Sequence, residues 1–333
     1  MPSLALVTRC GVVDIGSNSI HLLIAERERL SSGSAAGYRI RRIESPATLL
    51  GLGRVVAASG RLDESAAREL SRTVARQVKQ AERAKVSELH VVATAAVRQA
   101  ANGRERMAAL SREIGAPIRI LTARREAELG FIGLVDDLDP ALEQVTIDGG
   151  GASTEVSIAH GRRRGAAVSL PVGGSLLSVT CDDPPTAAQL AGVREHVEDL
   201  LALLPTGRPA AAVATGGSAR KLPLVVGGRS GQAVDLAMIA RALTALRAVP
   251  SAVLAKGTGL QRRRVQSLAA GAIILESVLT HYGLERCRLS PRGIREGILV
   301  AAADEPEHWW VDVQDVLARR DQLDAQRARV VAA

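Results

Sequence analysis

The sequence predicts an α/β protein of two related domains with mixed sheets flanked by helices, and three observations lead to this prediction. The segment GVVDIGSNSIHLLIAE (Gly11–Glu26) is an apolar run that stops at an aspartate, turns through small polar residues and begins again. The segment VTIDGGGASTEVSIA (Val145–Ala159) repeats that pattern. Three pairs of positions align in the two segments: Asp14 with Asp148, Gly16 with Gly150, and Ser19 with Ser153. Hairpins and strand–helix units also occur in both halves, which is typical of mixed sheets flanked by helices.

Composition sets the broad class of the protein. A chain of 333 residues is long enough for two domains, and with 47% hydrophobic but only 2% aromatic residues their cores must be aliphatic. The net charge of +8 suggests a polyanionic partner such as nucleic acid, a nucleotide, polyphosphate or an anionic membrane, although an arginine-rich composition can also reflect codon bias. The three scattered cysteines, and the lack of a signal sequence or a membrane-length apolar run, predict a cytoplasmic protein without membrane association.

The elements of the first half follow from apolar spacing, caps and turns. Asp63 can accept the hydrogen bond that starts a helix, and apolar residues spaced by three and four predict this helix over 63–85. Gly115 and Pro117 would end a second helix over 104–114. The other expected elements are a hairpin over 10–26, an irregular strand over 38–50, strands over 89–93 and 118–121, and a helix over 124–135.

The second half begins with a new set of strands. We expect strands over 144–148 and 154–159 and a third strand ending at Leu170. AAVATGGSARKL reads as a strand, a Gly-Gly turn and a helix start, and CRLSPRGIREGILVAAA as a strand, a turn and a helix. Further helices are expected over 186–204, 234–247 and 261–281, and a charged helix over 311–331.

The two Asp-Gly turns suit phosphate chemistry. A glycine lets the backbone approach a ligand, successive amides can form an anion-binding nest, and a carboxylate at a strand end can hold a hard cation. A single such turn is more often an ordinary hairpin turn, but the in-phase repetition favours a functional interpretation. Two loops facing each other would bind a phosphate chain from both sides, and the ATGGS turn (Ala214–Ser218) adds a third glycine turn.

Several motifs in order resemble the exopolyphosphatase / guanosine-pentaphosphate phosphatase (Ppx/GppA) family of the actin, sugar-kinase and chaperone ATPase superfamily. They cover about residues 10–300 and read VVDIGSNSIHLLIAE, VVATAAVRQAANG, REAELGFIGL, IDGGGASTEVSI, SLPVGG, ATGGSARKL and SPRGIREGIL. The resemblance implies two actin-like (ribonuclease H-like) domains with the active site in the cleft between them. We expect domain I over 1–124, completed by C-terminal helices over about 298–333, and domain II over 125–297, as in the short, two-domain members.

The resemblance also implies hydrolysis of a terminal phosphoanhydride bond with release of orthophosphate. Glu126 would orient or deprotonate the water, and Arg98 would clamp phosphate, although from the residues alone these read equally as a first-turn glutamate and a surface arginine. Asp148 and Glu155, with Asp14 opposite, would hold Mg²⁺ or Mn²⁺. The other positions carried over are Gly16, Ser17, Asn18, Gly150, Gly151, Ser153, Gly216, Gly217 and Glu296.

Three positions depart from the family pattern. Arg125 replaces the first of two glutamates, Ala123 replaces a glycine, and Ala152 replaces the last glycine of the second loop. If Ala152 requires a positive φ, the loop geometry changes at some cost. These changes keep open the alternative of a polyphosphate- or nucleotide-binding regulator with weak catalysis.

The basic triplet Arg262, Arg263 and Arg264 reads by default as a solvated face and alternatively as an extended track for a polyanion. The expected partner is inorganic polyphosphate, and the close alternative is guanosine pentaphosphate. Nucleic acid is not an expected partner, and the sequence leaves a homodimer open. A sugar kinase or chaperone-type ATPase is disfavoured by Glu126 on its helix and by the Arg-Glu-Gly motif.

Overall fold

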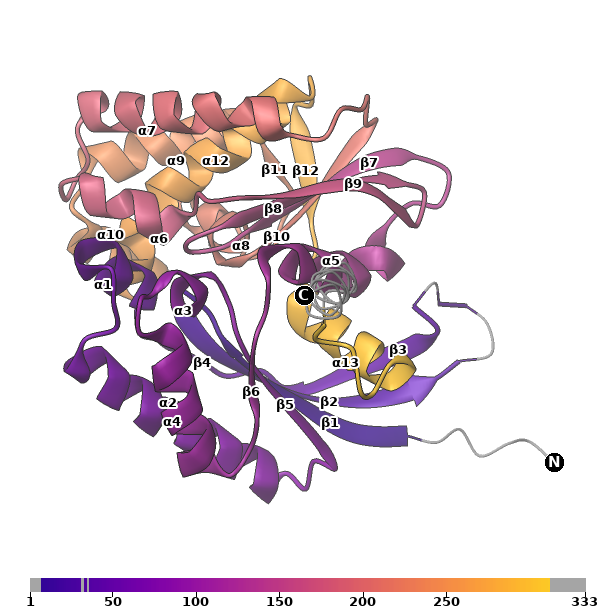
Figure 1. Ribbon diagram of the computed structural model, residues 1–333. Coiled ribbons are helices and arrows are strands. Elements are labelled where there is room, and N and C mark those ends of the chain that lie inside the picture. Colours follow the sequence, from indigo (N-terminus) through magenta and orange to yellow (C-terminus); the bar gives the residue numbers. More distant parts are fainter. Residues whose placement is uncertain (1–6, 31–32, 35, 312–333) are drawn as a thin grey trace, which may run out of the picture.

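The computed structural model describes residues 7–311 apart from 31, 32 and 35, and the chain forms two six-stranded sheets with helices around them (Figure 1). The first sheet has the order β3-β2-β1-β5-β6, with β4 paired to β2. Its strands are β1 (Val7–Ile15), β2 (Ser19–Arg29), β3 (Tyr38–Glu44), β4 (Ala47–Leu49), β5 (Glu88–Ala93) and β6 (Ile118–Ile120). The β1–β2 hairpin is antiparallel, whereas β5 and β6 continue the sheet in parallel.

The second sheet repeats this plan. Its order is β11-β12-β10-β7-β8-β9, with antiparallel pairs from β7 to β9 and parallel pairs from β7 through β10 to β12. Its strands are β7 (Glu143–Gly149), β8 (Thr154–His160), β9 (Arg163–Leu170), β10 (Ala211–Thr215), β11 (Val234–Asp235) and β12 (Arg286–Leu289). The hairpins β1–β2 and β7–β8 occupy the same place in the two sheets, so the repeated sequence pattern is a repeated structural unit.

Four helices accompany the first sheet among the described residues. They are α1 (Leu52–Ser59), α2 (Glu64–Arg83), α3 (Ala95–Gln99) and α4 (Gly103–Ile114). Asp63 caps α2 as expected, because its carboxylate accepts from the Ala66 amide at 2.8 Å. The short helices α1 and α3 were not predicted.

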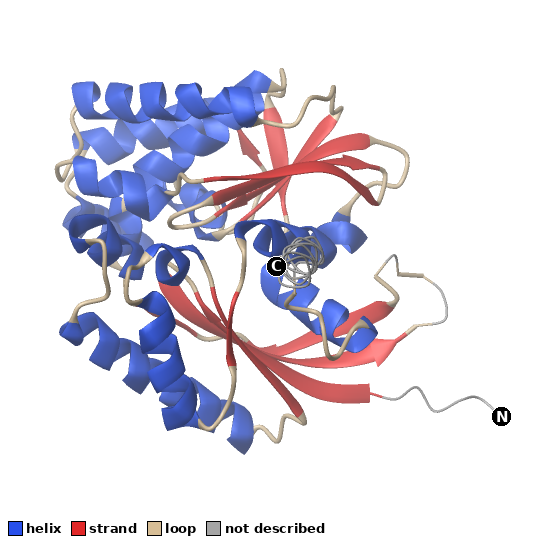
Figure 2. Cartoon of the chain, in the orientation of Figure 1, coloured by secondary structure: helices blue, strands red, loops and turns tan. Residues whose placement is uncertain are grey.

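The second sheet is covered by α7, α9 and α12 (Figure 2). The helices of this half are α6 (Gly174–Leu177), α7 (Ala187–Leu200), α8 (Gly217–Val225), α9 (Leu236–Ala248), α10 (Ser251–Thr258), α11 (Arg262–Gln266) and α12 (Leu268–His281), with 3₁₀ turns η2 (Ser178–Thr180) and η3 (Leu201–Leu203). The single helix predicted over 261–281 is therefore wrong in one respect, since it divides at Ser267 into α11 and α12.

Two helices lie between the sheets, α5 (Ala123–Leu134), which continues into the 3₁₀ turn η1 (Val135–Asp137), and α13 (Ile294–Asp304) (Figure 1). They cross with their backbones in contact, since a Cβ on Gly297 would lie 1.8 Å from the Leu129 carbonyl oxygen. Leu129 packs with the first sheet and Phe131 with the second. The predicted boundary after residue 124 therefore falls at the start of a helix that contacts both sheets.

Trp309, near the end of the described chain, is buried at 3% exposed and makes an edge contact with His90, with 5.0 Å between the ring centroids. The helix expected over 311–331 and the predicted domain completion beyond residue 311 lie outside the described residues. No helix in the described part of the chain is long and apolar enough to cross a membrane.

Candidate active site

A cleft of about 420 Å³ separates the two sheets, and both Asp-Gly turns open into it. The predicted turn residues and every predicted carboxylate except Glu296 line this cleft: Asp14, Gly16, Ser17, Asn18, Glu126, Asp148, Gly150, Gly151, Ser153, Glu155, Gly216 and Gly217. Glu296 pairs instead with Arg42. Since these residues come from both halves of the chain, the fold brings the two repeated units to one place.

The two turns are closed in the same way. The Gly16 amide donates to the Ser19 carbonyl at 3.2 Å, and the Gly150 amide donates to the Ser153 carbonyl at 3.0 Å. These two amides are therefore used within the turns, contrary to their predicted role toward a ligand. Next to them, the amides of Ser17, Asn18 and Gly151 donate to no backbone carbonyl among the described residues, so these three are the candidates for an anion-binding nest.

Backbone conformation decides which positions of the loops must be glycine. Gly216 has φ +95°, and a Cβ there would lie 2.3 Å from the Gly149 carbonyl oxygen. Ala152 is different, because Lys85 is the only non-glycine residue with positive φ in the described chain. The condition under which Ala152 would change the loop geometry is therefore not met, and its methyl group is buried.

Asp14 and Asp148 sit at equivalent strand ends, and burial raises the pKa of each carboxyl to about 6. Repulsion from Asp14 raises the pKa of Asp148 further, whereas Arg295 opposes the shift at both sites. The Oδ1 atom of Asp14 is buried and has no hydrogen-bond partner among the residues that the structure describes. A buried carboxylate oxygen without a partner is costly unless a cation or water completes it.

Glu126 lies in the first turn of α5, where the Thr122 side chain caps the helix by accepting from the Arg125 amide at 3.1 Å. Burial raises the pKa of Glu126 to about 7, Asp14 and Asp148 add to the shift, and Arg98 opposes it. Arg98 donates to Glu126 Oε2 and to the Leu121 carbonyl, each at 2.8 Å. Arg98 does not line the cleft. This geometry therefore favours a role in positioning Glu126, rather than the predicted role of a phosphate clamp.

Glu155 faces Asp148 across the β7–β8 hairpin, as His21 faces Asp14 across β1–β2. Burial and repulsion from Glu126 and Asp148 hold the pKa of Glu155 well above its usual range. The surroundings of His21 are of the opposite sign. Burial lowers its pKa well below the usual range, and four arginines, Arg295, Arg264, Arg220 and Arg42, lower it further. The cleft therefore has two regions of opposite charge. The acidic pole consists of Asp14, Glu126, Asp148 and Glu155, and the basic pole, around His21, consists of Arg42, Arg220, Arg264 and Arg295.

The donor set at the acidic pole consists of hard oxygen ligands, which suits Mg²⁺ or Mn²⁺. No group of three or more acidic, histidine or cysteine side chains is arranged to hold a metal among the described residues. Mg²⁺ commonly binds through one or two carboxylates together with substrate phosphates and water. The partnerless Asp14 oxygen fits that kind of site.

Six cationic side chains line the cleft, and five of them were not predicted: Arg42, Arg220, Lys221, Arg292 and Arg295, in addition to Arg264. Arg42 pairs with Glu296 at 2.5 Å and Arg292 with Asp136 at 2.9 Å. The other four form no ion pair with any described carboxylate. Arg220, Lys221, Arg292 and Arg295 belong to the ATGGSARKL and SPRGIREGIL segments, so their nearness to glycine turns was a usable signal.

The triplet Arg262–Arg264 divides among three environments. Arg264 lines the cleft, and its Nη2 atom lies 3.4 Å from Ser19 Oγ. Arg262 is held by Asp183 at 2.7 Å, and Arg263 donates to the Leu50 carbonyl at 3.3 Å. This geometry disfavours the alternative of one continuous track through all three, because a short helix directs successive side chains to different sides.

Two of the departures from the family pattern do not disturb the cleft. Arg125 turns away from it and donates from Nε to the Trp309 carbonyl at 2.7 Å, and from Nη1 to Glu128 at 3.0 Å. Ala123 is the first residue of α5, behind the Thr122 cap. Neither position places a foreign charge beside Glu126.

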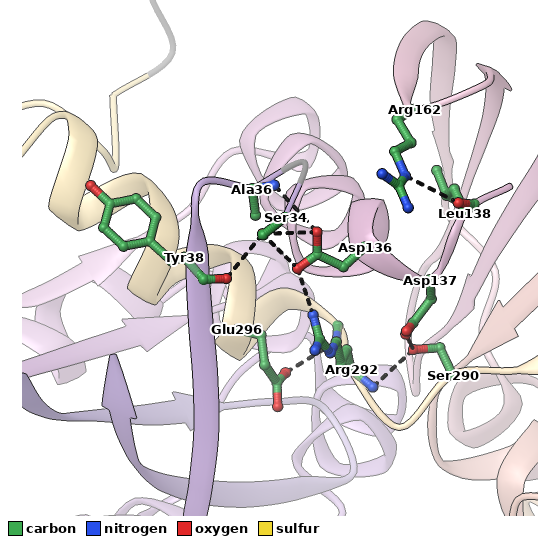
Figure 3. Close-up of polar contacts among 11 residues, drawn as sticks. Ser34, Ala36, Tyr38, Asp136, Asp137, Leu138, Arg162, Ser290, Arg292 and Glu296 are labelled. Atoms are coloured by element: carbon green, nitrogen blue, oxygen red, sulfur yellow. Dashed lines mark hydrogen bonds and ion pairs between the residues drawn. The ribbon is translucent and has the colours of Figure 1, made fainter. Parts of the chain in front are cut away.

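A polar network joins the end of α5 to the rim of the cleft (Figure 3). Asp136 accepts from Arg292 at 2.9 Å, from Ser34 Oγ at 3.0 Å and from the Ala36 amide at 3.3 Å. Ser290 donates to Asp137 at 2.5 Å. The network fixes the β12–α13 connection, and with it Arg292, against both halves of the molecule.

The chain resembles known proteins over most of its length. The model of the Ppx/GppA phosphatase family matches residues 32–305. Exopolyphosphatase 1 of Mycobacterium leprae (strain TN) is 28% identical over 314 residues, which cover 89% of this chain and 90% of the relative. Exopolyphosphatase 1 of Mycobacterium tuberculosis (strain ATCC 25618 / H37Rv) is 29% identical over 311 residues, which cover 89% and 88%.

Solved structures show the same overall fold as this chain. The Ppx/GppA family member of Aquifex aeolicus superposes with a TM-score of 0.72 at 26% identity, covering 91% of this chain and all of that one. An exopolyphosphatase from Cytophaga hutchinsonii superposes with a TM-score of 0.77 at 20% identity, covering 89% and 98%, a likeness of fold alone. These neighbours confirm the predicted actin-like architecture of two mixed sheets.

Proposed function

The chain belongs to the Ppx/GppA phosphatase family, and from this premise we propose that it is an exopolyphosphatase, a phosphoanhydride hydrolase that removes orthophosphate from the end of inorganic polyphosphate. The observation that carries the proposal is the pairing of a buried carboxylate pole with a cationic pole in one cleft. A linear polyanion can reach both poles at once. Its terminal phosphoryl group lies at Glu126, and the following phosphates lie against Arg42, Arg220, Arg264 and Arg295.

The lining of the cleft favours polyphosphate over guanosine pentaphosphate. Nucleic-acid bases are commonly held by stacking on aromatic rings, and also on arginine guanidinium planes. The described residues that line the cleft include no Phe, Tyr or Trp, and Trp309 packs elsewhere against His90. A guanine base would find arginine and glycine here but no aromatic platform.

In the proposed reaction, Glu126 accepts a proton from the attacking water while Arg98 holds its carboxylate in position. The amides of Ser17, Asn18 and Gly151 donate to the oxygens of the transferring phosphoryl group. Phosphoryl transfer depends mainly on positioning and charge stabilisation, and losing one preorganised donor costs about 3–4 kcal/mol of barrier.

Asp14, Asp148 and Glu155 are the residues that would hold Mg²⁺ or Mn²⁺. A divalent ion held there would supply positive charge that offsets the charge of the substrate phosphates. Burial raises the pKa of each of these carboxyl groups and so favours the protonated form, and a bound cation would favour the ionised form. Metal binding would therefore release protons from the acidic pole.

The proposal is tested by measuring phosphate release from polyphosphate, guanosine pentaphosphate and ATP side by side, with Mg²⁺ and with Mn²⁺. We expect polyphosphate to be the preferred substrate. Preference for the guanosine nucleotide would replace the proposal by its closest alternative. Binding of polyphosphate without release of phosphate would identify a regulator with weak catalysis.

Glu126→Gln should abolish turnover and leave polyphosphate binding intact, because the amide keeps the shape of the side chain but cannot accept the proton. The matched control is Glu128→Gln, two residues along α5, whose carboxylate pairs with Arg124, Arg125 and Arg164. A Glu126→Gln rate above about one tenth of wild type, a loss of under 1.4 kcal/mol, would show that Glu126 does not activate the water.

A further inference from the structure

The exposed face of α2 carries a regular row of cations. We call it the basic stripe, and its members recur every three or four residues: Arg68, Arg72, Arg76, Lys79 and Arg83. All five are exposed, whereas the opposite face of the helix is buried through Leu70, Val74 and Gln77. Side chains at this spacing lie about 5–6 Å apart, so the stripe runs along about 22 Å of helix.

The charge of the stripe is not neutralised within the described chain. None of its members forms an ion pair with a described carboxylate, although the exposed Glu69 and Glu82 flank it on the same helix. Glu64, the acid in the first turn of α2, forms an ion pair with Arg106 of α4 and not with a member of the stripe. A solvated helix face usually alternates its charges, whereas here five cations follow one another along one line.

The stripe is connected to the cleft through the strand β4 and the residues before it. Arg295, a cleft residue, donates to Ser45 Oγ at 3.1 Å, and Arg76 donates to Thr48 Oγ1 at 3.2 Å. Ser45 and Ala47 themselves line the cleft. Three residues of extended chain span about 10 Å, so a polyanion that leaves the basic pole over Ser45 meets the stripe at Arg76.

We propose that the basic stripe of α2 is a second binding segment for the substrate, which holds the part of a long polyphosphate chain outside the cleft. This inference rests on the proposed function. Polyphosphate fits because its charge is linear and evenly spaced, like that of the stripe, and because the cleft can enclose only its end. The stripe adds affinity for long polyphosphate chains, whereas a short polyphosphate does not reach it.

The test removes charge from the stripe and leaves the cleft intact. In the variant R68Q/R72Q/K79Q/R83Q, glutamine keeps helix propensity, and Arg76 keeps its contact with Thr48. The matched control is R208Q/R241Q/R247Q/K256Q, which removes four exposed and unpaired cations from the second half of the molecule. KM and kcat are measured for triphosphate and for long-chain polyphosphate, and long-chain binding is measured in chelator as a function of salt.

We expect the stripe variant to raise KM for long chains at least about fivefold, with kcat and the triphosphate kinetics unchanged. The slope of log affinity against log salt should fall by about 3, by analogy with the counterions released per phosphate contact in nucleic acids. The control variant should match wild type. If the quadruple variant does not fold by circular dichroism, R68Q/R72Q and K79Q/R83Q should each show part of the same effect.

Equal long-chain KM values in the stripe and control variants, with normal triphosphate hydrolysis, would overturn the inference and leave the proposed function standing. The inference also fails if the stripe variant loses binding of single-stranded DNA but keeps polyphosphate binding. A wild-type protein that hydrolyses neither triphosphate nor long chains would overturn the proposed function, and this inference with it.

Discussion

At the scale of single residues, the reactivity of Glu126 depends on one guanidinium group. Burial and the neighbouring carboxylates favour the protonated acid, and both the charge and the hydrogen bond of Arg98 favour the ionised base. With a pKa of about 7, a substantial fraction of Glu126 is ionised near neutral pH. A water-activating base must be ionised, so the rate should rise with pH through this range.

Arg98→Gln should move the acid limb of kcat/KM to higher pH, because the pKa of Glu126 rises when its cation is removed. Activity on the acid side should fall about tenfold for each unit by which the limb moves. At a pH well above the limb the variant should approach the wild-type KM. The exposed Arg112 of α4 provides the control Arg112→Gln. A KM raised equally at every pH would instead restore the phosphate-clamp interpretation of Arg98.

The residues of the two turns could be predicted from the sequence because the turn pattern occurs twice and glycine has few substitutes there. The directions of Arg98, Arg262 and Arg42 could not be predicted. An arginine side chain is long, and whether it reaches a carboxylate, a carbonyl or the cleft depends on which elements pack beside it. The carboxylate Asp183, which holds Arg262, is far from it in the sequence.

At the scale of elements, the placement of the site depends on how closely α5 and α13 cross. Glycines at the crossing let the backbones touch, since a Cβ on Gly133 would lie 1.9 Å from the Gly293 carbonyl oxygen. α5 carries Glu126 and α13 carries Arg295, so this crossing sets the separation of the acidic and basic groups.

Gly297→Ala and Gly133→Ala should each destabilise the protein by about 3 kcal/mol or more, because the added methyl groups meet backbone atoms that cannot move aside without separating the helices. Gly192→Ala is the control, since Gly192 is also helical but has nothing within 4 Å of its Cβ position. That change should stabilise by about 0.5–1 kcal/mol. Denaturant midpoints give the comparison, and three equal values would mean that the helices do not cross as described.

The elements that the sequence predicted well are those with local signals. Asp63 caps α2, and the apolar spacing of that helix matches its buried face. Helix α1 was missed because it has only eight residues and lies between Gly51 and Gly60, which have φ values of 70° and 69°. The break at Ser267 was missed because the apolar spacing of Val265, Leu268 and Ala272 continues across it.

At the scale of the whole molecule, the cleft separates charge at a cost to stability. Four carboxyl groups with raised pKa values and a cluster of arginines without carboxylate partners face the same space. Arg295 offsets only part of the pKa shift at Asp14 and Asp148. A cation bound at the acidic pole and a polyanion bound at the basic pole would each reduce the repulsion between like charges there. Ligand binding and stability should therefore be strongly linked.

Asp148→Asn should therefore stabilise the ligand-free protein above pH 6 by on the order of 1–3 kcal/mol, while it lowers activity and raises the Mg²⁺ concentration needed for half-maximal rate. The folded pKa of about 6 lies above the unfolded value of 3.8, so Asp148 lowers stability progressively as pH rises from about 4 to 6. His21 has the opposite effect, because its depressed pKa makes the fold lose stability as pH falls below its unfolded value of 6.5. Because His21 is present in both proteins, its contribution cancels when the free energy of unfolding of the wild type is subtracted from that of the variant.

The measurement is the free energy of unfolding from pH 4 to pH 8 in chelator, and again in Mg²⁺. The variant should lose less stability than wild type as pH rises, and it should gain less from Mg²⁺, because a neutral amide is a weaker ligand for a hard cation. The exposed Asp199 supplies the control Asp199→Asn. If the pH dependence of stability were the same in Asp148→Asn as in wild type, the acidic pole would not carry the charge that binds the ion, and the metal would have to be held by the substrate phosphates alone.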